Sequence, residues 1–292
     1  MDTIIDYVFR NPIAIIAKKE IMDTIRNKWI ILIISIITIL TLLASYGGSF
    51  FGNDWSDLSV TIVGIIVIVQ IFVSIMGLML GYATIVGEIE KGSMNSLLSL
   101  PSTRLEILIG KFLGLGSVLT FSLFIGFGIS ALIIGFNVEN VNYPEYFSFV
   151  LASILLGLVF LSIGILFSSL LKKRSTAMGA SIGIWILFMP LVWSLIMAAI
   201  ALATNVFSLD LTDVESIIIP DWYYAIDMIN PIQIYSYLVS LNVPSVLASQ
   251  SDIASQFEYP SFITVPITTI LLFGWILVCL ILAFWRFSKK DI

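Results

Sequence analysis

Long apolar runs alternate with short polar segments along almost the whole chain, and this alternation predicts its elements. Six runs contain no Asp, Glu, Lys, Arg or His in their middle. Each is close to or above the length of about 20 apolar residues that a helix needs to cross a bilayer. We therefore expect an all-α integral membrane protein with six transmembrane helices. The runs are Trp29 to Tyr46, Val60 to Val86, Leu108 to Phe136, Phe147 to Leu171, Ala177 to Thr204 and Val265 to Phe284.

The segment before the first run, "NPIAIIAKKEIMDTIRNKW", has a helical pattern with one apolar and one charged side. Asn11 can cap it and Pro12 suits its first turn, so we expect an interfacial amphipathic helix along the inner leaflet. Glu20 falls within the apolar stripe. Two interpretations stay open: its side chain extends to water, or it forms an ion pair with a basic residue between the second and third runs.

The stretch "IVGEIEKGSMNSLLSLPSTRLEILIGK" joins the second and third runs and is unusually polar. Gly92 can end one helix, and Pro101 can end a second short one, "SMNSLLSL", that Ser93 caps. Thr103 and Glu106 have the spacing of a capping box for the third run. A two-turn helix is not stable alone in water, so it must pack on something. Its own N-terminal helix and a groove in a partner protein are the two alternatives.

The last connection, about residues 205 to 264, is too long for a simple turn and is rich in tyrosine and tryptophan, which favour the headgroup layer. Pro220, Pro231 and Pro244 divide it into pieces that are too short to span a bilayer. We expect short helices there, at the outer face. Pro190 should kink the fifth run. No repeat or low-complexity tract interrupts the chain, so residues 1–292 should form a single transmembrane domain.

Composition and charge agree with a membrane protein and orient it. The chain has 292 residues, is 59% hydrophobic and 11% charged, and has a mean hydropathy of +1.07. All 14 Lys and Arg residues lie before the first run, between the second and third or at the start of the third, between the fourth and fifth, or near the C-terminus. By the positive-inside rule, both termini are cytoplasmic. We expect a multi-pass protein of a prokaryotic plasma membrane, with the lipid bilayer and no nucleic acid as partner.

Most catalytic and metal chemistry is disfavoured by the residue types. The chain has no histidine and one cysteine, Cys279, so we expect no zinc, haem or copper thiolate site. No motif that cradles nucleotide phosphates is present, and no catalytic constellation stands out, so we expect no enzyme. If the protein moves a molecule, the energy must come from another polypeptide at the basic face.

The stretch from Ile85, with its Glu, Gly, Leu-Leu, Pro and Gly-Lys residues, resembles the signature of ABC-2 type transporter permeases. "KKEIMDTIRNKW" and "NPIQIYSYL" extend the resemblance, which is to the branch that includes the nitrous-oxide-reductase maturation transporter. It implies a permease that pairs with a second copy or a homologous one and binds two separate ABC ATPase subunits, which carry ATP and Mg. Glu20 would belong to the connecting helix. The resemblance implies this ATPase-coupling elbow: Glu88, Glu90, Gly92, Ser93, Met94, Leu97, Leu98 and Pro101.

The function that we expect is transport or extrusion of a hydrophobic or amphipathic substrate, or transmission of force to an outer protein partner. A cavity between the two copies would be lined by the second and fifth runs, including Gln70, Ser74, Thr84 and Ser194. The lack of histidine and of a cysteine pair speaks against a copper role. Two alternatives stay open: a membrane anchor or assembly scaffold that transports nothing, and a channel that works without ATP.

Overall fold

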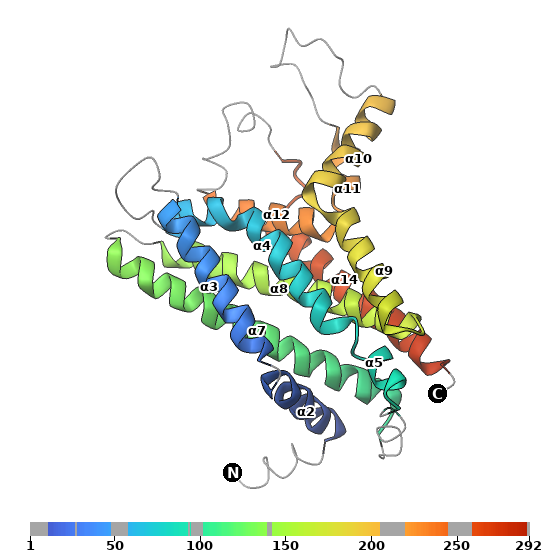
Figure 1. The fold of residues 1–292 in the computed structure, drawn as a ribbon. Coiled ribbons are helices and arrows are strands. Elements are labelled where there is room, and N and C mark those ends of the chain that lie inside the picture. The colour runs from blue at the N-terminus through green and yellow to red at the C-terminus, as the bar shows by residue number, and fades with distance from the viewer. Residues whose placement is uncertain are drawn as a thin grey trace.

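The computed structural model describes residues 11–26, 28–47, 58–92, 94, 102–138, 142–204, 220–244 and 259–290, and all regular structure in these ranges is helical. Figure 1 shows the long helices running roughly side by side, with α2 and α5 at one end and α10, α11 and α12 toward the other. The all-α prediction is confirmed. The helices are α2 (Pro12–Arg26), α3 (Trp29–Gly47), α4 (Leu58–Gly81), α5 (Val86–Glu90), α7 (Arg104–Asn137), α8 (Tyr143–Leu170), α9 (Arg174–Phe188), α10 (Pro190–Ala203), α11 (Asp221–Asp227), α12 (Pro231–Asn242) and α14 (Val265–Ser288).

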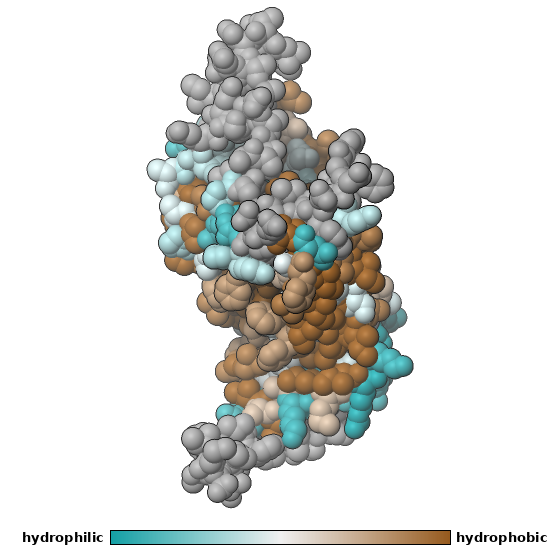
Figure 2. Space-filling model, turned by 90° about the vertical axis from the view of Figure 1, so that its left-hand side faces the viewer, coloured by the Kyte–Doolittle hydropathy of each residue, from teal (hydrophilic) through white to brown (hydrophobic). Residues whose placement is uncertain are grey.

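Four helical stretches within the described ranges are long and apolar enough to cross a membrane: Thr61–Glu90, Arg104–Asn137, Tyr143–Leu170 and Val265–Ser288. The number rises to six if each of two bent pairs counts as one span. The protein is therefore a multi-pass membrane protein, and the count of six stays a prediction. Figure 2 shows a broad hydrophobic belt across the middle of one face, with hydrophilic residues at both ends.

Helix α8 forms the centre of the molecule, because 83% of its apolar stretch is buried, against 28% for that of α14. It packs most extensively against α4, where glycines let the two backbones approach. A Cβ atom at Gly77 would collide with the carbonyl oxygen of Gly157, and one at Gly81 would lie 2.6 Å from that of Leu161. Small residues therefore allow close packing of these two helices. A Cβ at Gly179 or Gly183 would meet no described atom within 4 Å.

The predicted kink at Pro190 is confirmed as a 57° bend between α9 and α10. Two side chains from the segment of α11 and α12 brace it. Asn230 donates its Nδ2 hydrogen bond to the carbonyl oxygen of Phe188 at 3.0 Å. Trp193 donates from Nε1 to the buried carboxylate of Asp227 at 2.7 Å. Helices α11 and α12 lie in the segment where short helices are expected.

Two cations connect the C-terminal end of α14 to α7 and α8 by hydrogen bonds. The Arg104 guanidinium donates to the carbonyl oxygens of Phe287, Ser288 and Lys290 at 2.6, 3.0 and 2.9 Å. The Lys290 ammonium donates to the carbonyls of Ser169 and Leu171 at 3.2 and 2.8 Å. Cations at these positions satisfy carbonyls that a helix end leaves without intrahelical partners.

Candidate functional site

The five-residue helix α5 lies in the polar stretch between α4 and α7, and its ends explain its length. Gly92 follows it with φ +72°, a left-handed conformation that glycine adopts without steric cost, so the chain turns away there. At its start, Ser168 of α8 accepts hydrogen bonds from the backbone N–H groups of Ile85 and Val86 at 2.8 and 3.0 Å. A helix too short to be stable alone is thus anchored to α8, the most buried of the four candidate spans in the described ranges.

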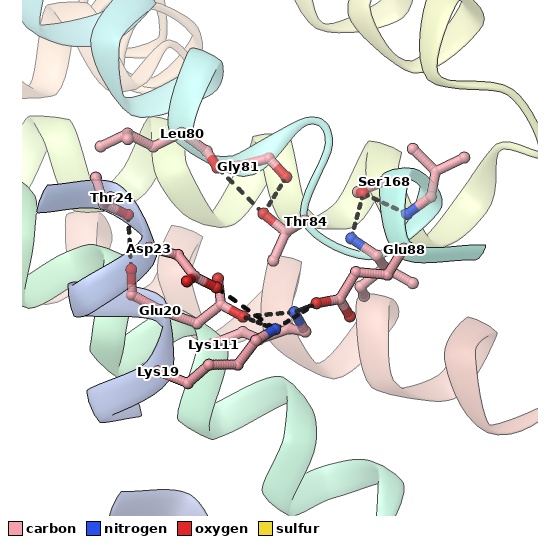
Figure 3. Close-up of polar contacts among 12 residues, drawn as sticks. Lys19, Glu20, Asp23, Thr24, Leu80, Gly81, Thr84, Glu88, Lys111 and Ser168 are labelled. Carbon is pink, nitrogen blue, oxygen red and sulfur yellow. Dashed lines mark hydrogen bonds and ion pairs between the residues drawn. The ribbon is translucent and has the colours of Figure 1, made fainter. Parts of the chain in front are cut away.

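The first carboxylate of α5, Glu88, faces two lysines from other helices, as Figure 3 shows. Lys111 of α7 places its Nζ 2.8 Å from Oε1 of Glu88 and 2.7 Å from Oε1 of Glu20. Lys19 of α2 lies 2.9 Å from the same Glu88 oxygen. The Lys111 side chain is only 1% exposed, so its charge must be compensated by partners within the chain. The network therefore joins α2, α5 and α7.

The interface between α2 and α7 depends on two glycines. A Cβ at Gly114 would lie 2.7 Å from the carbonyl oxygen of Ala17, and one at Gly110 would lie 2.9 Å from Cβ of Ile16. Their absence lets α2 approach α7 closely enough for Glu20 to reach Lys111. Of the two interpretations of Glu20, the ion pair with a basic residue is therefore confirmed.

Opposite charges within the network balance one another near neutral pH. Burial lowers the pKa of Lys19, but the hydrogen bond to Glu88 and the charges of Glu20, Glu88 and Asp23 outweigh this effect, so the pKa is raised above its ordinary value. Lys19 consequently stays an ammonium group at neutral pH. Lys19 and Lys111 then offset the carboxylates of Glu20 and Glu88.

The second carboxylate of α5, Glu90, points to another helix. Its Oε1 accepts a hydrogen bond from the backbone N–H of Arg174 at 2.8 Å, which places a negative charge at the N-terminus of α9. The Arg174 guanidinium lies 5.5 Å from the centre of the Tyr82 ring and donates to its hydroxyl at 3.1 Å. We name the resulting set the α5 hub: Lys19, Glu20, Glu88, Glu90, Lys111, Ser168 and Arg174.

The structure brings together part of the predicted elbow. Glu88, Glu90 and Gly92 lie in and after α5, as described above. Met94 is 1% exposed and belongs to a buried apolar cluster with residues such as Ile16 and Ile107. The remaining predicted elbow residues, Ser93, Leu97, Leu98 and Pro101, lie outside the described residues. Their role stays a prediction.

The four predicted cavity residues have different surroundings. Gln70 is buried and donates from Nε2 to Ser236 of α12 at 2.6 Å, and Ser74 donates to the carbonyl of Gln70 at 2.5 Å. Thr84 donates to the carbonyl of Gly81 at 2.7 Å and lines a polar cavity beside the α5 hub. Ser194 is exposed on α10. A cavity between two copies stays a prediction.

Sequence reasoning did not predict the hydrogen bonds of Ser168 or the contacts of Arg174, and it did not name Lys111 as the partner of Glu20. A signal existed for Lys111, since it is a cation near the start of an otherwise uncharged apolar run. None existed for Ser168, because serines occur at many positions of these helices. Among the described residues, no group of three or more His, Cys, Asp or Glu side chains could hold a metal ion, and Cys279 is buried.

Comparisons with known proteins give a consistent result. The model of the family described as "ABC-2 family transporter protein" matches residues 14–292. A protein of Stutzerimonas stutzeri named "Probable ABC transporter permease protein NosY" is 29% identical over 286 residues, which cover 96% of this chain and 99% of that protein. A protein of Pseudomonas aeruginosa with the same name is 34% identical over 182 residues, which cover 60% of this chain and 66% of that protein.

Proposed function

Because the chain belongs to the ABC-2 family of transporter proteins and is the membrane permease subunit of an ABC transporter, we propose that separate ATPase subunits drive it through the segment around α5. Permease components of ABC transporters lack an ATPase site of their own. ATP and Mg would then bind to the ATPase subunits, and this chain would receive mechanical work.

The observation that carries the proposal is the α5 hub. A helix of five residues is joined by short polar contacts to α2, α7, α8 and α9, so a displacement of residues 93–101, which follow it, reaches four helices at once. Packed helices respond to such a local push by rigid-body tilting more readily than by bending. Tilting of several helices together is what opening one side of a transport path requires.

The architecture that fits this mechanism has six spans, with α2 along the inner leaflet and both termini in the cytoplasm. Basic residues near the α5 end support this orientation, since Lys and Arg favour the cytoplasmic side. Two permease copies would form twelve spans and bind two ATPase subunits in the inner membrane of a prokaryote. The substrate would be hydrophobic or amphipathic, because the described helices carry few polar groups between their ends.

Co-purification from the native host tests the central claim. The tagged permease should bring down an ABC ATPase, and the double variant Leu97→Asp and Leu98→Asp should lose that ATPase or its stimulation, because two charges replace the apolar contact surface. The matched double variant Leu97→Met and Leu98→Met keeps an apolar surface of similar volume and should keep stimulation.

Two other outcomes would reject the proposal. A permease that never binds an ATPase, and whose Asp variants behave as the parent, would be a scaffold. A permease that passes current across a bilayer without nucleotide would be a channel.

A further inference from the structure

A polar cavity of about 460 Å³ lies beside the α5 hub, between α2, the end of α4, α5 and the start of α9. Its volume falls within the range of small-molecule sites. Cations from three different elements line it: Arg26 from the end of α2, Lys91 after α5, and Arg174 at the start of α9. Met79 and Leu80 of α4 line its apolar side. The cavity therefore combines positive charge with a hydrophobic wall.

The carboxylates that line the cavity, Glu20, Asp23 and Glu88, are already within reach of ammonium groups. Lys19 lies 3.5, 3.9 and 2.9 Å from their oxygens, and Lys111 lies within 2.8 Å of two of them. A bound cation would have to compete with these lysines. The cavity is thus a poor site for a cation.

The three cations that line the cavity differ from these carboxylates in their pairing. Within the described part of the chain, no ion pair joins Arg26, Lys91 or Arg174 to a carboxylate side chain. Arg174 is also held in place, since its guanidinium stacks on Tyr82 and donates one hydrogen bond to the hydroxyl. A positioned guanidinium with further N–H donors matches the geometry of a phosphate group.

From this arrangement we infer that the cavity binds the phosphate group of an anionic amphiphile that enters from the inner leaflet. The phosphate lies among Arg26, Lys91 and Arg174, and the start of the apolar chain contacts Met79 and Leu80. The inference rests on the proposed function for the orientation of the chain, and it deepens that function by naming the chemistry of the molecule that reaches the path. A lipid headgroup and free inorganic phosphate share this anionic chemistry.

Native mass spectrometry of the detergent-purified full chain tests the inference, with phosphatidylglycerol and phosphatidylcholine of matched acyl chains as probes. Phosphatidylglycerol should bind more tightly than phosphatidylcholine. The double variant Arg26→Gln and Lys91→Gln should weaken phosphatidylglycerol binding roughly 30-fold, and each single variant roughly 5-fold. The matched double variant Lys28→Gln and Lys173→Gln removes the same charge at the same end of the molecule but outside the cavity. It should lower the affinity by less than about 3-fold, because charges outside the site act only through screened surface attraction.

Equal losses of phosphatidylglycerol affinity in both double variants would show diffuse attraction to a basic surface and would overturn the site. An unchanged affinity in both double variants would also overturn it. If the first double variant does not fold, the two single variants decide the question by the same criteria. Inorganic phosphate distinguishes the sources: displacement of the lipid at equal concentration would overturn the assignment to an amphiphile, whereas weak competition supports it. Lipid binding is measured without nucleotide, so loss of ATPase co-purification would reject the proposed function and leave this measurement standing.

Discussion

At the scale of single residues, the energetic importance of an ion pair follows its burial. Lys19 and Asp23 are 3.9 Å apart with side chains 43% and 51% exposed, and exposed pairs of this kind contribute about 0–1 kcal/mol. Lys111 is 1% exposed and contacts two carboxylates at 2.7 and 2.8 Å. Removing one member of a buried group of charges leaves the others uncompensated, which costs about 3–5 kcal/mol. Lys111 is therefore the residue on which the α5 hub depends most.

Replacing Lys111 by Met should destabilise the protein by about 3–5 kcal/mol, because Glu20 and Glu88 then lose their buried shared cation and keep only the half-exposed Lys19. Thermal unfolding of the purified protein in detergent measures the effect. The control Asp23→Asn, at the exposed end of the network, should cost less than about 1 kcal/mol. Adding Glu20→Gln and Glu88→Gln to the Met variant should restore most of the loss. A Lys111→Met variant as stable as the parent would contradict the assigned role of the network.

At the scale of elements, the features that short stretches of sequence determine were predicted: the long helices, a bend and a helix cap. The apolar runs predicted the long helices, Pro190 predicted the bend, and Thr103 with Glu106 forms the predicted capping box. Contacts between distant positions could not be predicted in the same way. Glu90 and the N–H of Arg174 are 84 residues apart, and their meeting depends on how α5 and α9 pack, which no periodicity reports. For Glu20, both interpretations satisfied the sequence, and only the approach of α2 to α7 decided between them.

The tight crossing of α4 and α8 gives a prediction at this scale. Gly77→Ala should destabilise the protein by about 1–3 kcal/mol, since the added methyl group would collide with the carbonyl of Gly157 and lie 2.9 Å from the backbone nitrogen of Leu161. Gly274→Ala in α14 is the matched control, because its Cβ would meet no described atom within 4 Å. That variant should be neutral or up to about 1 kcal/mol more stable, as expected from helix propensity. Equal melting temperatures for the two variants would show that the crossing tolerates a side chain.

At the scale of the whole molecule, charge is distributed unevenly along the axis of the long helices. The basic residues of the α5 hub and of the α8–α9 turn lie at one end, and the acidic, aromatic segment of α11 and α12 lies toward the other (Figure 1). A polar network such as the α5 hub can exchange force with a cytoplasmic ATPase only if its end faces the cytoplasm. Orientation is thus the property on which the proposed mechanism and the lipid site both rest.

Single cysteines in a Cys279→Ser background test the orientation in intact cells. A membrane-impermeant maleimide should label Asp221→Cys, which is exposed at the start of α11, without permeabilisation. Lys173→Cys, exposed between α8 and α9, should be labelled only after the membrane is opened. The reverse pattern would place the α5 hub outside the cell, where no ATP-driven subunit could act on it.

The contacts of Arg104 and Lys290 at the end of α14 matter for anyone who attaches a reporter to this protein. Five backbone carbonyls are satisfied there by two side chains, so the last turn of α14 is held against α7 and α8. A fluorescent protein fused directly behind Lys290 would disturb the contacts of this last turn, whereas a long glycine-serine spacer would leave them intact. Fusion proteins that differ only in spacer length would therefore separate damage by the reporter from loss of function.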